Sequence, residues 1–240
     1  MLAIEEVLRQ CGVTDASLTR EEKERLEGDG YLLFADLARG TWLEDLRAGL
    51  DGATAEREGG TRHVGGLIGA GEAFDRVYQH PKILAAVHHV LRRSFRVAEL
   101  HGREPLRGFG QQGLHADARP RSASEPFGIV TTLWMIDDFT PDNGATRIVP
   151  RSHLSLSPPP RALADPGSHH KDEFVVTGSA GTVLLFNGHL WHSGTKNRSG
   201  ARRRAVQLLF AAHDAAWHVD TPPQVPEGLA PAARALLGLR

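Results

Sequence analysis

Cysteine is nearly missing from this 240-residue chain, because Cys11 is the only one. A single cysteine excludes an internal disulfide and a thiolate metal cluster, and it favours a reducing compartment. Long apolar runs are missing too, since no segment approaches the ~20 residues of a membrane-spanning helix. The first residues lack the basic start and apolar core of a signal peptide. We therefore expect a soluble, cytoplasmic protein.

A strong net charge is also lacking. The formal charge is −1 at pH 7, so no global field favours nucleic acid or an anionic membrane as a partner. Hydrophobic residues make up 40% and charged residues 24% of the chain, as in ordinary globular proteins. We expect a small-molecule substrate as the partner, and the oligomeric state stays open.

The length fits one domain over residues 1–240. We expect a helical N-terminal part (about 1–93), a β core (about 94–212) and a C-terminal tail (213–240). In the first part, Thr19 and Glu22 form a capping-box pattern. A short strand is expected at 31–34, helices at 41–50 and 81–92, and a mobile Gly-rich connection at 51–71.

From Phe95 onward the pattern changes to short strands separated by Gly, Pro, Asp and Asn turns. Such a series predicts a mainly β fold, a sandwich or jelly roll. The polar stretch 151–171 is long for a loop, which favours a functional or disordered segment bordering the site. The expected strands are 95–100, 113–117, 129–137, 145–149, 172–177, 181–186, 190–194 and 203–211.

The sequence His115-Ala116-Asp117 predicts a metal site. In a strand, residues i and i+2 share one face, so both side chains would point together, and His192 would complete the set. Two histidines and one carboxylate on one octahedral face are the ligands of non-haem Fe(II) oxygenases. The pattern alone is weak, since the chain has 13 histidines. Zn(II) accepts the same ligands, and His189 is an alternative distal ligand.

Arg203 follows His192 by eleven residues and helps to distinguish an Fe(II) oxygenase from a Zn(II) site. In a strand, Arg203 would face inward while Arg202 and Arg204 face solvent. A buried guanidinium needs an anionic partner, and its fork fits the distal carboxylate of 2-oxoglutarate. The alternative is a basic turn of three solvated arginines. Gln207 would share the inward face of Arg203.

Several separated motifs resemble the phytanoyl-CoA dioxygenase family, over roughly residues 18–212. They are Leu18-Thr19-Arg20-Glu21 with Asp29-Gly30-Tyr31, His115-Ala116-Asp117, the stretch from Asp137 to His153, and His192-Ser193-Gly194 with Arg203. The resemblance implies a double-stranded β-helix (jelly-roll) core. It also implies that Fe(II) is bound by His115, Asp117 and His192, and that Arg203 anchors the cosubstrate 2-oxoglutarate.

The chain departs from the family pattern at three positions. Arg151 replaces the glycine of the Pro-Gly-Ser-His turn. Gly194 stands where a hydroxyl commonly assists the arginine, so Ser193 or Thr195 would have to help. Leu133 replaces an aromatic residue near the cosubstrate, with Trp134 on the other face. Gln112 and its neighbour Gln111 are further pocket candidates, as is His101.

The resemblance implies a dioxygenase that uses dioxygen and converts 2-oxoglutarate to succinate and CO2 while it oxidises a C–H bond. We expect hydroxylation of a small metabolite or natural product. Desaturation, cyclisation or epimerisation with the same cofactors stays open, as does a free, CoA-linked or carrier-bound substrate. The rivals are a metal-binding jelly-roll sensor without turnover and a zinc hydrolase, which would need a general base that we cannot identify.

Overall fold

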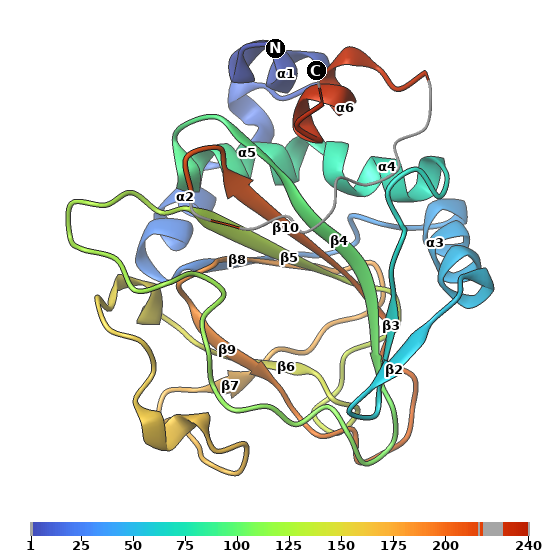
Figure 1. The fold of residues 1–240 in the computed structure, drawn as a ribbon, viewed down its shortest axis with the longest axis vertical. Coiled ribbons are helices and arrows are strands. Elements are labelled where there is room, and N and C mark those ends of the chain that lie inside the picture. The colour runs from blue at the N-terminus through green and yellow to red at the C-terminus, as the bar shows by residue number, and fades with distance from the viewer. Residues whose placement is uncertain (1, 216, 218–227, 240) are drawn as a thin grey trace.

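Two antiparallel β-sheets form the centre of the protein in the computed structural model, which describes residues 2–215, 217 and 228–239 (Figure 1). The larger sheet has the strand order β1-β8-β5-β10-β4-β3-β2, and the smaller sheet has the order β7-β6-β9. The larger sheet consists of β1 (Tyr31–Phe34), β2 (Glu56–Glu58), β3 (Thr61–Val64), β4 (Phe95–Pro105), β5 (Ile129–Met135), β8 (Val183–Asn187) and β10 (Ala205–Ala212). The smaller sheet consists of β6 (Thr146–Val149), β7 (Phe174–Val175) and β9 (Trp191–Gly194).

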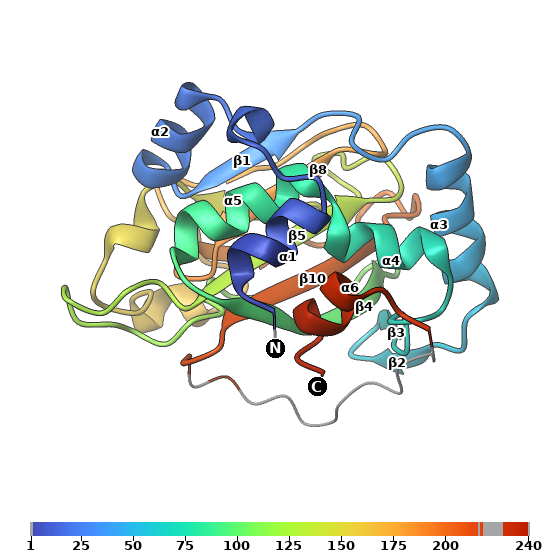
Figure 2. The same ribbon diagram turned by 90° about the horizontal axis from the view of Figure 1, so that it is seen from above.

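Helices cover the outer face of the larger sheet, where Figure 2 shows α1, α4, α5 and α6 lying across it. The helix α2 begins as its sequence predicts, because Thr19 accepts from the amide of Glu22 while Glu22 accepts from the amide of Thr19. The helices are α1 (Ile4–Gln10), α2 (Arg20–Gly28), α3 (Thr41–Gly52), α4 (Glu72–Gln79), α5 (Pro81–Leu91) and α6 (Pro231–Leu236). Single 3-10 turns lie at Asp15–Ser17, Ser152–Leu154 and Arg161–Ala164.

Two apolar layers hold this architecture together, and β5 contributes to both. Trp134 and Val130 point into the layer under the helices, whereas Leu133 and Met135 point into the layer between the sheets. All seven residues of β5 are buried, because the strand is covered on both faces. The predicted mainly β jelly-roll fold is confirmed, as is the opposite orientation of Leu133 and Trp134.

The expected strand over 113–117 is wrong. Only His115 forms a bridge, with His192, in this stretch. Just before His115 the backbone instead bonds to the 3-10 turn Arg161–Ala164, since the amide of Leu114 donates to the carbonyl of Leu163 at 2.8 Å. A Cβ on Gly113 would overlap the carbonyl of Ala164, so this close approach requires glycine. Sheet pairing therefore ends after a single bridge.

The segment 51–71, expected as a Gly-rich connection, contains a hairpin of β2 and β3 that was not expected. Glu58 pairs with Thr61 around Gly59-Gly60, and both glycines have positive φ values of 50° and 74°. A two-residue Gly-Gly turn of this kind is a hairpin signal that the sequence contains. The strand β3 then pairs with β4, which extends to Pro105, beyond the expected end at residue 100.

Other element ends shift by a few residues, and some elements were not expected at all. The strand β7 is limited to Phe174–Val175 within the expected 172–177, and β10 starts two residues after Arg203. The helices α4 and α6 were not foreseen. Of the expected tail over 213–240, residues 216, 218–227 and 240 lie outside the described residues. Among the described residues, no helix is long and apolar enough to cross a membrane.

Candidate metal centre

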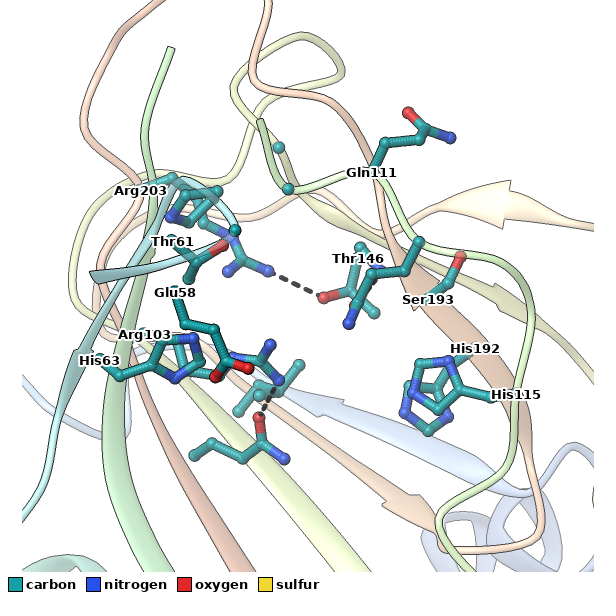
Figure 3. A pocket seen from close by; sticks show the side chains of 18 of the residues that line it. Glu58, Thr61, His63, Arg103, Gln111, His115, Thr146, His192, Ser193 and Arg203 are labelled. Carbon is teal, nitrogen blue, oxygen red and sulfur yellow. Dashed lines mark hydrogen bonds between the residues drawn. The ribbon is translucent and has the colours of Figure 1, made fainter. Parts of the chain in front are cut away.

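A cavity of about 320 Å³ lies between the two sheets and contains the predicted metal triad (Figure 3). Its floor comes from β4, β5 and β10 of the larger sheet, and the hairpin of β2 and β3 forms one wall. The small sheet and the segment around residue 115 form the opposite wall. The residues that line the cavity include Glu58, His63, Arg103, Gln112, His115, Asp117, Leu133, Thr146, His192, Ser193, Arg203 and Gln207.

His115, Asp117 and His192 converge at one point of this cavity. Each offers a ligand atom, and these atoms all lie within 4.8 Å of one another. His192 Nε2 is 3.5 Å from Asp117 Oδ1. Ligands about 2.1 Å from one metal and at right angles would lie about 3 Å apart, so a small closure of the triad suffices. Although 113–117 is not a strand, the bridge at residue 115 still brings the two imidazoles together.

Backbone carbonyls fix the tautomer of both histidines. His115 Nδ1 lies 3.0 Å from the carbonyl oxygen of Gly113, and His192 Nδ1 lies 2.9 Å from that of Leu190. A carbonyl only accepts hydrogen bonds, so each Nδ1 carries a proton and each Nε2 is left to face the triad. This arrangement orients metal-binding histidines in many proteins. The two rings are therefore ready to coordinate a cation through Nε2.

The third group is an ionised carboxylate. Burial would raise the pKa of Asp117, but His192, by charge and hydrogen bond, and the hydroxyl of Thr131 lower it to about 2. Thr131 Oγ1 donates to Asp117 Oδ2 at 2.6 Å, which leaves Oδ1 on the side of the histidines. Burial and the neighbouring His192 lower the pKa of His115. A charged carboxylate beside a neutral imidazole suits a divalent cation.

Arg203 lies in the same cavity and has no anionic partner among the described residues. Only 6% of the residue is exposed, and Nη2 donates to Thr146 Oγ1 at 2.9 Å. Its Nε is buried and has no hydrogen-bond partner in the described part of the chain. Burial, followed by the charge of Arg103, lowers the pKa of Arg203 to about 9. A buried guanidinium in this condition is a strong receptor for a carboxylate.

The ring of Phe139 supports Arg203 from behind, with the guanidinium carbon 4.2 Å from the ring centroid. This cation–π contact stabilises the guanidinium without using its hydrogen-bond donors. The donors consequently stay available for a ligand in the cavity. Arg203 lies two residues before β10 and lines the cavity together with the triad.

Comparison with known proteins places this site in a family. The model of the phytanoyl-CoA dioxygenase family matches residues 26–205, well over half of the chain. The chain belongs to the phytanoyl-CoA dioxygenase family. Dioxygenase trt7 of Aspergillus terreus (strain NIH 2624 / FGSC A1156) is 29% identical over 195 residues, which are 75% of this chain and 65% of that protein. The chain thus spans slightly less than two thirds of this relative.

Two solved structures share the fold. HygX from Streptomyces hygroscopicus, crystallised with nickel, 2-oxoglutarate and hygromycin B, has a TM-score of 0.73 and 21% identity, covering 84% of this chain and 90% of its own. SnoN, a non-haem α-ketoglutarate-dependent epimerase from nogalamycin biosynthesis, has a TM-score of 0.65 and 19% identity, covering 87% and 85%. At these identities the likeness establishes the jelly-roll fold of this family member.

Of the other residues expected at the site, five line the cavity, namely Gln111, Gln112, Leu133, Ser193 and Gln207, whereas His101 is not among the lining residues. The side chain of Thr195 is buried instead, and its hydroxyl donates to the carbonyl of Ala145 at 2.7 Å. His189 also faces away from the triad, since its Nδ1 contacts Asn187 Oδ1 at 3.2 Å. The structure thus brings His192, and not His189, to His115 and Asp117.

The expectation that Arg202 and Arg204 both face solvent is wrong for Arg204. Its guanidinium forms hydrogen bonds with both oxygens of Asp137 at 2.6–2.8 Å and with Asp51 at 2.9 Å, and the residue is only 7% exposed. Arg202 is half exposed and pairs with Glu104. Ion pairing compensates the burial of Arg204, which strand parity alone cannot anticipate. Arg203 remains the one arginine of the three that reaches the cavity.

Sequence reasoning missed Thr146 and Arg147, which follow one another in β6. Thr146 accepts from Arg203, as described above. Arg147 is 1% exposed and donates to Ser193 Oγ at 2.6 Å, to the carbonyl of Gln112 at 3.1 Å and to Glu173. It thereby connects the segment before His115 to the strand that carries His192. Both residues lie within the Asp137–His153 motif, which was the available signal.

Proposed function

We propose that this protein is an Fe(II)- and 2-oxoglutarate-dependent dioxygenase that hydroxylates a C–H bond of a small molecule. The observation that carries the proposal is the presence of two complementary features in one cavity. One is a histidine–aspartate–histidine triad whose ligand atoms meet at one point, and the other is a buried arginine that has no anionic partner among the described residues. A metal and a dicarboxylate match these features.

The donor set fits iron in its chemistry. His115, Asp117 and His192 would hold Fe(II) through two imidazole nitrogens and one carboxylate oxygen, which leaves room on the cavity side for a bidentate 2-oxo acid. When bound, Fe(II) supplies the electrons that activate dioxygen while 2-oxoglutarate is converted to succinate and CO2. Family membership, the dioxygenase name of trt7, and HygX with its bound 2-oxoglutarate support this assignment.

Arg203 and Thr146 would receive the distal carboxylate of 2-oxoglutarate. The fork of Arg203 offers Nε and the Nη atoms, while Thr146 fixes one Nη2 hydrogen and so orients the fork. Ser193, Leu133 and Gln112 line the same cavity and would shape the space around the cosubstrate. Gln112 and Ser193 are themselves held, by the amide of Gly194 and by Arg147. These contacts make the pocket rigid before the ligand enters.

The large sheet and the hairpin would hold the substrate next to the metal and exclude water. Leu133 and Phe186 provide apolar surface beside the triad, whereas Arg103, His63 and Gln207 provide polar groups. Positioning a target carbon close to the oxidant is the main contribution of the protein in such reactions. Epimerisation, as in SnoN, uses the same cofactors and is the second outcome to test.

The decisive experiment measures succinate formed from 2-oxoglutarate under air in the presence of Fe(II), without added substrate. We expect slow, iron-dependent turnover that the Asp117→Ala variant loses together with iron, measured as bound metal after dialysis. A metal-loaded native enzyme that never converts or binds 2-oxoglutarate would contradict the proposal and favour a sensor or a zinc hydrolase. With a substrate in hand, one added oxygen atom in the product mass identifies hydroxylation, and an unchanged mass identifies epimerisation.

A further inference from the structure

Arg103 is a second cation of the cavity for which the proposed function leaves no partner. It lies near the end of β4, is half-buried, and lines the cavity together with Arg203. Figure 3 shows both guanidinium groups directed into the space that His115 and His192 border. Its one hydrogen bond among the described residues is a donation from Nη1 to Gln207 Oε1, at 3.3 Å.

The lack of an ion pair distinguishes Arg103 and Arg203 from the arginines around them. Neither forms an ion pair with any described residue. Burial lowers the pKa of Arg103, and the charges of Asp117, Glu99 and Glu58 offset only part of this effect. Four arginines of the neighbouring segments pair with carboxylates, namely Arg62, Arg147, Arg202 and Arg204. Unpaired guanidinium groups that face a cavity are receptors for anions from outside the chain.

One molecule of 2-oxoglutarate accounts for only one of the two arginines. Its distal carboxylate belongs to Arg203, and its other end belongs to the metal. Arg103 occupies a different part of the cavity floor, since it pairs across the strands with Ala205 on one side and His63 on the other. The strand of His63 is next to the edge strand β2, whose three residues are all exposed. Arg103 is therefore closer than Arg203 to the rim of the site.

The surroundings of Arg103 suit a polar ligand group. Gln207 holds one Nη1 hydrogen, and the ring of His63 lies beside it. Burial, followed by the charge of Arg103, lowers the pKa of His63, so the imidazole is a neutral hydrogen-bonding group at pH 7. The strands β4 and β10 are central in the sheet, which fixes the side chains before a ligand arrives. Preorganised donors of this kind determine specificity.

We propose that Arg103 is a specificity-determining residue that binds an oxyanion group of the substrate, a carboxylate or a phosphate, with Gln207 and His63 beside it. The substrate is thus a small anionic molecule, bound with its charged group on Arg103 and its reacting carbon toward the triad. This inference rests on the proposed function, because it assigns 2-oxoglutarate to Arg203.

The test begins with cosubstrate binding to the Ni(II)-loaded protein by calorimetry. We expect Arg103→Gln to change the Kd of 2-oxoglutarate by less than about threefold, whereas Arg203→Gln weakens it by about 30-fold or more. Pyruvate, which lacks the distal carboxylate, should also bind Arg103→Gln like the native protein. Loss of both ligands in Arg103→Gln would show that Arg103 holds the 2-oxo acid end of the cosubstrate, and would overturn the inference.

The second step uses the protein saturated with Ni(II) and 2-oxoglutarate. Small carboxylic acids are compared with their primary amides, and phosphate monoesters with their parent alcohols, by ligand-observed NMR. We expect one class of anion to bind about tenfold or more tightly than its neutral partner, as a charged hydrogen bond provides. Arg103→Gln should abolish this preference, and the outward-facing Arg202→Gln should keep it.

The outcomes separate the two hypotheses. If native protein binds 2-oxoglutarate through Arg203 but shows no preference for anions, the inference about Arg103 fails while the proposed function stands. A preference that survives Arg103→Gln equally contradicts the inference. If 2-oxoglutarate does not bind the Ni(II)-loaded native protein at all, the proposed function itself fails. Circular dichroism of each variant establishes that the fold is retained.

Discussion

Thr146 lies directly opposite Gly194 in the pairing of β6 with β9, and it supplies the hydroxyl that Arg203 contacts. Gly194 is the position where a hydroxyl was expected from the family pattern. The structure shows that the contact comes from the neighbouring strand at the same register. A Cβ at Gly194 would lie 2.6 Å from the carbonyl oxygen of Gly110, so no side chain fits there without a shift. The position of the hydroxyl is thus a consequence of close packing.

Removal of this hydroxyl should weaken cosubstrate binding. We expect Thr146→Val to raise the Kd of 2-oxoglutarate about tenfold, because a hydrogen bond to a charged group contributes about 1.5 kcal/mol. Calorimetry on the Ni(II)-loaded protein measures the effect. Thr195→Val is the matched control, since that hydroxyl donates to Ala145 and is directed away from the cavity. Equal losses in the two variants would show that Thr146 does not orient Arg203.

Thr131 should tune the metal site without binding the metal. Its hydroxyl donates to Asp117 Oδ2 at 2.6 Å, and loss of such an outer contact commonly costs 10- to 100-fold in metal affinity, so we expect about this decrease for Thr131→Val. Equilibrium dialysis with Ni(II) or Fe(II) measures it. The adjacent Thr132 faces the other side, where its hydroxyl contacts Trp134 and Leu208. Thr132→Val should therefore keep the metal affinity, and a loss there instead would refute this role of Thr131.

Arg151 has a left-handed backbone, with a φ of 68°, at the position where the family usually has glycine. This conformation destabilises an L-residue by roughly 1–2 kcal/mol, and glycine avoids that cost. Glycine has more freedom in the unfolded chain, which offsets roughly 0.5–1 kcal/mol of the gain. Arg151→Gly should therefore stabilise the fold by about 0.5–1 kcal/mol in a denaturant titration. The side chain is exposed and forms no hydrogen bond or ion pair with another described residue, so the change removes none. Destabilisation would show that Arg151 has a partner role in the loop.

His80 should make the fold less stable in mild acid. Burial, followed by the charges of Arg76 and Lys82, lowers the pKa of His80 from 6.5 to about 4. Between these values the unfolded chain takes up a proton that the folded chain refuses, so stability present above pH 6.5 is lost as the pH falls toward 4. Because the residue is only partly buried, we expect His80 to account for about 1 kcal/mol of the loss between pH 7 and pH 5.

The variant His80→Phe tests this expectation. Phenylalanine retains a ring that can stack on Trp42, where the imidazole now lies nearly parallel at 6.0 Å, but it does not titrate. The free energy of unfolding of His80→Phe should depend less steeply on pH between 5 and 7 than that of the native protein. Parallel pH profiles for both proteins would rule out a contribution of His80.

The sequence by itself determined the fold class and the members of the metal triad. Short apolar runs bounded by turn residues predict the strands β5, β8 and β10, which are buried almost throughout because both of their faces are covered. Motifs in one order along the chain carried the family resemblance. The sequence also identified Arg203 and the opposite orientations of Leu133 and Trp134. These features follow from local periodicity, which a sequence expresses directly.

Only the tertiary structure decided how the site is completed. The hydroxyl of Thr146, the buried ion pair of Arg204 with Asp137, and the placement of Arg103 beside His63 all join residues from different strands. The register between such strands depends on packing across the sheet and between the sheets, which no single segment encodes. His115 and Asp117 converge through one bridge and a bend, not a regular strand. The amide of the preceding residue, Leu114, donates to Leu163 and is therefore not available for sheet pairing.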